Sequence, residues 1–209
     1  MNLLSRLLSM ISAGPSEQIA GYSKRELQAL FNAPLSLADL TNQVNLMPLI
    51  DSGIAACHAT FLMDPEDAAR LASLVASRFR ATHQRTFNGQ PVVEYHHRLN
   101  AERLVLFGSS QEFNGVTMRL VTNSTDFLNL LSQETFAVPP PWIAFNDYPP
   151  SWWSDNMQGA QGHYNDCYFV PFFTRLSDVE KRAYCARFAA SPAWIERLEW
   201  LYGVIASAE

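Results

Sequence analysis

Four short segments between residues 85 and 121 constrain the fold most strongly, because they are rich in strand-forming residues and separated by turn residues. They span residues 85–87, 92–95, 104–107 and 116–121. Asn88-Gly89 separates the first pair and favours the positive φ angles of a two-residue hairpin turn. A polar loop ending in Asn114-Gly115 joins the second pair. Strands this close in sequence pair as antiparallel neighbours, so we expect a central antiparallel sheet.

A well-marked helix start precedes these segments at Asp64-Pro65-Glu66-Asp67. It combines an N-cap residue, proline at the first helical position and acids in the first turn. Apolar residues follow at spacings of three and four, namely Ala68, Leu71, Ala72, Val75 and Phe79. The pattern predicts a helix over 65–82 that covers the sheet. A strand over 57–62 is expected before it.

Two capping boxes indicate further helix starts, Ser23 with Glu26 and Ser177 with Glu180. Ser191-Pro192 opens a last helix, so the C-terminus should form a helical hairpin. Ser124 should cap a helix through Leu131. Near the N-terminus we expect helices over 3–11, docking on the domain or on a partner, and over 36–45. The predicted class is α+β, with N-terminal helices, a central antiparallel sheet, a covering helix at about 65–82 and a C-terminal helical hairpin, in a single domain over 1–209.

Cysteine usage and hydropathy favour a cytoplasmic protein. The three cysteines are odd in number and form no CxxC pair, which argues against a disulfide framework and a cysteine-rich zinc site. No stretch approaches the ~20 apolar residues of a membrane span, so no membrane association is expected. The sequence predicts no cofactor and leaves the oligomeric state open.

The region from Leu120 to Thr174 holds five acidic residues and no Lys or Arg, so its charge equals the net −5 of the whole chain. A dense run of aromatic residues lies within 136–173, which is also rich in proline. An acidic surface repels phosphates, so nucleic acid is not expected as a partner, whereas a basic protein would be attracted. Prolines make 136–151 irregular, with one short edge strand at 142–145. We expect a long loop over 154–167 and a strand over 168–173.

These features predict a partner-binding protein without catalysis, most concretely an immunity protein that neutralises a basic toxin. Aspartates would steer the partner and aromatic rings would anchor it. The predicted partner-binding residues are Asp147, Tyr148, Trp152, Trp153, Asp155, His163, Tyr164 and Asp166. Of the adjacent tryptophans, at least one is expected to be exposed. The alternative is an enzyme acting on a small molecule or glycan, with carboxylates of the 147–166 loop beside a tryptophan platform.

Other groups of residues give weaker evidence of a functional site. His163 with Asp155 and Asp166 lacks a supporting motif, and His96-His97 on a strand is more typical of structural histidines, so no metal site is predicted. His163 and Cys167 suggest a thiol nucleophile with its base, although their spacing alone is no evidence of that geometry and no surrounding motif supports it. Six arginines between 78 and 119 resemble a phosphate-binding patch, although solvated or internally paired side chains explain them better.

Overall fold

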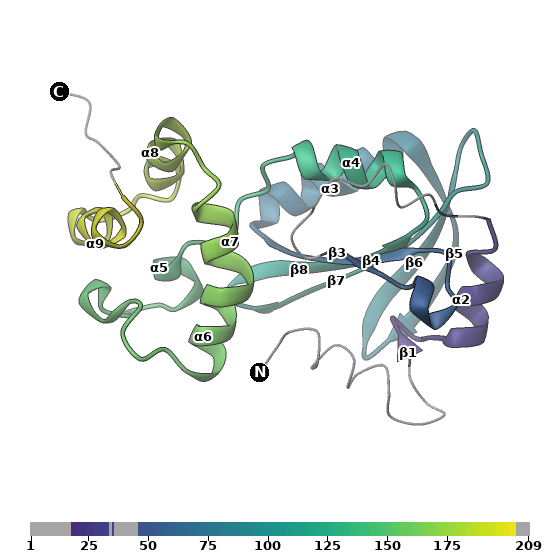
Figure 1. The fold of residues 1–209 in the computed structure, drawn as a ribbon, viewed down its shortest axis with the longest axis horizontal. Coiled ribbons are helices and arrows are strands. Elements are labelled where there is room, and N and C mark those ends of the chain that lie inside the picture. Colours follow the sequence, from purple (N-terminus) through teal and green to yellow (C-terminus); the bar gives the residue numbers. More distant parts are fainter. Residues whose placement is uncertain (1–17, 34, 36–45, 204–209) are drawn as a thin grey trace. The chain divides into compact units, whose positions relative to one another are not determined.

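The computed structural model describes residues 18–33, 35 and 46–203 of the 209-residue chain (Figure 1). The helices expected over 3–11 and 36–45 lie outside these residues. Contacts divide the chain into two compact units, which are described separately. Unit 1 comprises Met1–Thr60, Leu71–Gly108 and Met118–Glu134, and unit 2 comprises Phe61–Arg70, Ser109–Thr117 and Thr135–Glu209. That the chain is a single domain stays a prediction.

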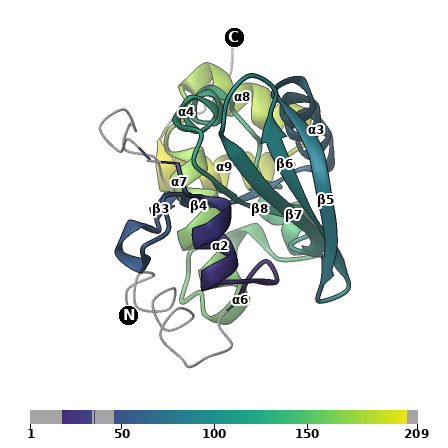
Figure 2. The same cartoon turned by 90° about the vertical axis from the view of Figure 1, so that its right-hand side faces the viewer.

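A six-stranded antiparallel sheet runs in the order β3-β4-β8-β7-β6-β5 (Figure 2). Its strands are β3 (Leu46–Pro48), β4 (Cys57–Met63), β5 (Phe79–Phe87), β6 (Gln90–His97), β7 (Arg103–Glu112) and β8 (Gly115–Thr122). The helices are α2 (Lys24–Leu30), α3 (Pro65–Arg78), α4 (Thr125–Gln133), α5 (Pro141–Ala144), α6 (Gly159–Tyr164), α7 (Val170–Phe173), α8 (Asp178–Arg187) and α9 (Pro192–Tyr202). The α+β class, the central sheet and the C-terminal helical hairpin are therefore confirmed.

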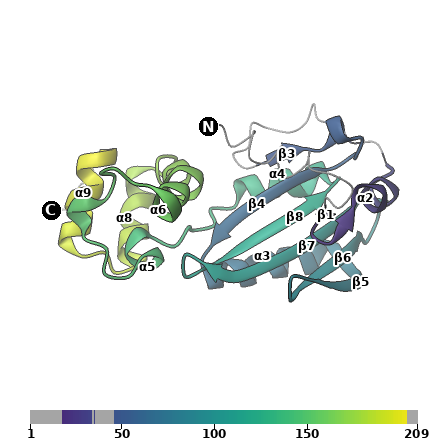
Figure 3. The same cartoon turned by 90° about the horizontal axis from the view of Figure 1, so that it is seen from below.

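Side-chain alternation along the strands divides the core of unit 1 between the two faces of the sheet. Val92, Val105 and Val121 pack with Leu27 of α2 on one face. α3 and α4 lie over the other face (Figure 3), where the rings of Phe79 and Phe127 meet edge to face at 5.1 Å. The sheet thus lies between α2 on one side and α3 with α4 on the other.

The predicted turns and caps are largely confirmed. Asn88 and Gly89 have φ angles of 50° and 75°, as a two-residue hairpin turn requires. Both capping boxes form, and Ser124 caps α4. The turn between β7 and β8 is tighter than the expected polar loop, with Phe113 and Asn114 at φ 56° and 51°.

The predicted end of the covering helix is wrong. The helix α3 ends at Arg78, and β5 begins at once with Phe79. Residues 79–87 pair along their length with β6, with Phe79 opposite His97 and Phe87 opposite Gln90. Pairing with an adjacent strand overrides the weak helical tendency of residues 79–82.

Helices occupy the part of unit 2 where the sequence suggested strands and loop. Residues 142–145 belong to α5 and its C-cap, not to an edge strand. The expected loop at 154–167 and strand at 168–173 are instead largely the helical run α6, a π-helical turn (Asn165–Phe169) and α7. Figure 1 shows this run as one continuous coil. The π turn precedes Pro171, which lacks the N–H that a regular helix would use.

Arg187 of α8 and Asp67 of α3 form the main polar contact of unit 2. The buried Asp67 carboxylate accepts the Ala137 N–H at 2.6 Å and an Arg187 N–H at 3.4 Å. Arg187 also reaches Asp64 at 3.0 Å and Glu66 at 3.3 Å. Three chain segments that are distant in sequence therefore meet at one carboxylate.

We expect Asp67→Ala to lower the free energy of unfolding by about 3 kcal/mol, because it leaves the buried Ala137 N–H without its acceptor and removes the buried carboxylate of the Arg187 ion-pair group. Glu66→Ala is the matched control, since the Glu66 side chain is 85% exposed and also contacts Arg187. The control should change stability by no more than about 0.5 kcal/mol. Equal losses in urea titrations of the two variants would contradict this role for Asp67.

The imidazole of His58, on β4, should make unit 1 sensitive to acid. Burial, together with the Arg119 guanidinium, lowers the pKa of His58 from 6.5 to about 4. Between these values the unfolded chain binds a proton that the folded protein does not. Stability is thus fully present above pH 6.5 and is lost as the pH falls towards 4, by up to about 3 kcal/mol.

His58→Gln should flatten this dependence in urea titrations between pH 4 and 6.5, whereas His83→Gln should retain it because His83 is exposed. Parallel curves for the wild type and His58→Gln would rule out His58 as the source.

Candidate partner-binding surface

Two of the predicted binding residues are core residues of unit 2. Trp153 and Tyr164 have no exposed surface, so their rings cannot anchor a partner. The Trp153 ring meets Tyr164, Phe169 and Trp194 edge to face at 5.8–6.1 Å. The Tyr164 hydroxyl donates to the Pro139 carbonyl, and burial raises the pKa of Tyr164 well above its ordinary value. This corrects the expectation that both rings belong to a binding surface.

Trp152, unlike its neighbour Trp153, is largely exposed, with 63% of its surface accessible to solvent. It ends the 3-10 turn Pro150–Trp152, which packs on α9. The expectation that one of the adjacent tryptophans is exposed is confirmed. On α9 itself Trp200 is 73% exposed, so unit 2 presents two large indoles to solvent from adjoining elements.

Arg197 holds these elements together. Its Nε donates to the Trp153 carbonyl at 2.8 Å, and its Nη2 lies 3.1 Å from a carboxylate oxygen of Asp155. The guanidinium carbon stacks 4.7 Å from the centre of the Trp200 ring, a favourable cation–π distance. The Arg197 side chain is only 15% exposed, which fixes its position. Trp152, Asp155, Arg197 and Trp200 are called the tryptophan patch below.

The predicted aspartates differ in their surroundings. Asp155 is paired with Arg197, so its charge is partly neutralised within the molecule. Asp147 is exposed and makes no hydrogen bond or ion pair with the described part of the chain. Asp166 is exposed and accepts a hydrogen bond from the Asn165 amide at 3.2 Å.

Tyr148 is half-buried beside the patch. Its hydroxyl donates to the Trp152 carbonyl at 3.4 Å, and its ring lies 5.7 Å from that of Trp153. Because it touches the backbone of Trp152, Tyr148 positions the exposed indole more than it offers its own surface.

His163 and Cys167 come together because their segment is helical. The Cys167 sulfur lies 3.3 Å from Nδ1 of His163, a contact that four-residue spacing creates on a helix. The imidazole is exposed and Cys167 is half-buried. Cys57 and Cys185 are buried, and burial raises the pKa of each thiol to about 11. The structure thus distinguishes one accessible thiol with a base beside it from two enclosed thiols.

Within the described residues, no group of three or more His, Cys, Asp and Glu side chains is arranged to hold a metal ion. None of the described helices is long and apolar enough to cross a bilayer. Comparisons with protein-family models, curated proteins and solved structures gave no match.

Sequence reasoning missed Trp200 and Arg197. A signal was present, because the apolar face of α9 includes Trp194 and Leu198, and Trp200 lies off that face. An indole on the polar side of an amphipathic helix is a feature that core packing does not explain.

We expect a thiol reagent to modify Cys167 first in the folded protein, with one fast equivalent, because the other thiols are buried and carry raised pKa values. Cys167→Ser should remove the fast phase and His163→Gln should slow it. Cys185→Ser is the control and should leave the phase unchanged. Fast labelling that persists in Cys167→Ser would disprove the assignment.

Proposed function

We propose that this protein binds a basic protein partner through the tryptophan patch, in the manner of an immunity protein that neutralises a basic toxin. The observation that carries the proposal is the pair of exposed indoles, 63% and 73% exposed, on elements fixed by Arg197. Exposed tryptophans on a rigid support are typical anchors of protein interfaces, since they supply contact area at little entropic cost.

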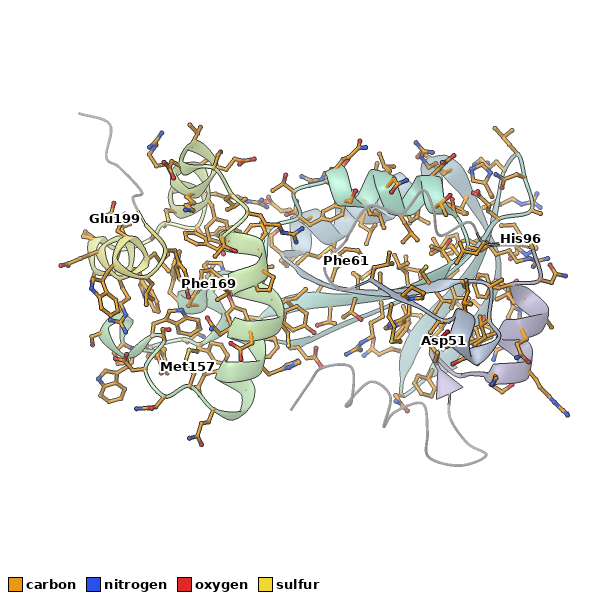
Figure 4. All side chains as sticks on the ribbon, viewed as in Figure 1. Asp51, Phe61, His96, Met157, Phe169 and Glu199 are labelled. Atoms are coloured by element: carbon orange, nitrogen blue, oxygen red, sulfur yellow. The ribbon has the colours of Figure 1, made fainter. Side chains whose placement is uncertain are left out.

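Charge supports the choice of a basic partner. Asp147 and Asp166 are exposed on unit 2, which carries the patch. α9 adds Glu196 and Glu199, of which Glu199 is labelled in Figure 4. Arg197 is already engaged by Asp155 and by the Trp153 carbonyl, so it adds little free positive charge. Carboxylates around an aromatic centre match the charged rim and apolar core of many interfaces. They would accelerate the approach of a basic partner.

The alternative, an enzyme that uses carboxylates of residues 147–166, stays a prediction. Asp155 is tied to Arg197, and Trp153 belongs to the core, so two of the groups that this alternative relies on are engaged elsewhere.

The proposal is tested by recovering the partner from the source cells with the immobilised protein and measuring the affinity of the purified pair. We expect Trp152→Ala and Trp200→Ala each to weaken binding by about 30-fold, because central tryptophans dominate interface energies. Leu99→Ala is the matched control, since Leu99 is 91% exposed and belongs to unit 1. Unchanged affinity in both tryptophan variants, with normal thermal unfolding, would remove the patch from the interface.

Charge reversal in the same assay tests the acidic rim. Asp147→Lys should slow association and weaken its dependence on salt, with little change in dissociation. The immunity role requires in addition that the partner alone arrests cell growth and that co-expression of this protein relieves the arrest. A harmless partner would exclude that role while leaving the binding surface intact.

A further inference from the structure

Unit 1 contains a cationic hollow of about 200 Å³ lined by Arg80, His96, His97 and Arg98. Arg80 and His96 are direct cross-strand neighbours on β5 and β6, so their side chains lie together on one face of the sheet. Arg98 follows β6 directly and continues the pairing through its N–H to the Arg78 carbonyl at 3.0 Å. His96, which belongs to β6, is labelled in Figure 4. The hollow shares no residue with the tryptophan patch.

The two arginines offer N–H donors to this hollow. The Arg80 side chain is exposed and makes no hydrogen bond or ion pair within the described part of the chain. Arg98 uses one terminal nitrogen to donate to the Ala76 carbonyl at 3.1 Å, which anchors the guanidinium and leaves other N–H groups available. Guanidinium groups have donors in a planar fork and no acceptor.

Each histidine has one nitrogen already engaged. Nδ1 of His97 accepts the Leu99 N–H at 3.3 Å, so in the neutral ring the proton lies on Nε2, which becomes a donor. Nε2 of His96 contacts Arg103 and lies 3.2 Å from Glu94, which leaves Nδ1 as the nitrogen without a partner in the described residues. The Glu94 carboxylate also pairs with Arg103 at 3.4 Å. This guanidinium partly neutralises the negative charge next to His96.

We propose that this hollow binds a phosphate group. Its lining includes two guanidinium groups and no carboxylate, which favours a ligand rich in acceptors. Its volume lies below the roughly 300–1,000 Å³ of pockets that enclose whole drug-sized molecules, so it suits a single small anion. A phosphate offers more oxygens than a carboxylate, and paired arginines match its geometry. The bound group is either free phosphate or the phosphate of a small monoester.

The test is isothermal titration calorimetry of the full chain with inorganic phosphate and, in a separate titration, with glycerol phosphate. We expect saturable binding at one site, and Arg80→Gln should weaken it by about tenfold because a charge-assisted hydrogen bond is lost. Arg25→Gln is the matched control: Arg25 is exposed on α2 and makes no hydrogen bond or ion pair with the described residues, so the variant removes one charge elsewhere. It should alter affinity less than twofold. Arg80 has no intramolecular partner among those residues, so Arg80→Gln should fold normally.

The outcomes separate the possibilities. Tighter binding of glycerol phosphate than of inorganic phosphate would assign a phosphorylated small molecule, and equal or weaker binding would assign the free ion. Acetate binding as tightly as phosphate would overturn the choice of phosphate. Absence of saturable binding, or equal loss in Arg80→Gln and Arg25→Gln, would overturn the site itself.

Discussion

The buried carboxylate of Asp67 is the constraint on which unit 2 depends. Removing a charge from water is costly unless partners replace the lost hydration, and here the Ala137 N–H and the Arg187 and Arg70 guanidiniums do so. Arg187 also binds Asp64, whose carboxylate accepts two N–H groups at the start of α3. The Asp64 carboxylate therefore both caps α3 and holds Arg187 of α8. A substitution of Asp64 would weaken the helix cap and the attachment of α8 together.

The tip of the β7–β8 hairpin shows how the aromatic core of unit 2 determines backbone conformation. Phe113 adopts a positive φ, which is unfavourable for a residue with a bulky side chain. Its ring contacts Phe145, Tyr164 and Tyr168 at 5.2–6.1 Å, and this packing offsets the strain. Gly115 follows where a Cβ atom would lie only 2.7 Å from Pro139, so only glycine permits this close approach.

Local signals in the sequence were sufficient for β4, β6, β7, β8 and most helix starts, because caps and two-residue turns depend on neighbouring residues alone. They missed β3 and assigned the first residues of β5 to a helix. They failed between residues 142 and 173, where tertiary packing decides. The ring of Phe169 stacks on those of Tyr164 and Phe173 along the helical run. Tyr164 and Phe169 are five residues apart across the π turn, and Phe169 and Phe173 are four residues apart after it. That interrupted spacing resembles neither a strand nor a regular helix, and the prolines nearby indicated irregular structure instead.

The same misassignment explains the errors in the predicted site. A loop would have exposed Tyr164 and separated His163 from Cys167, whereas a helix buries the first and brings the other two into contact. The aromatic run of residues 136–173 is therefore mainly the core that a helical unit of this size requires. Among the described residues of unit 2, the aromatic rings that the core leaves largely exposed are Trp152 and Trp200. Their exposure costs hydrophobic free energy that burial would otherwise recover, and binding a partner would recover it.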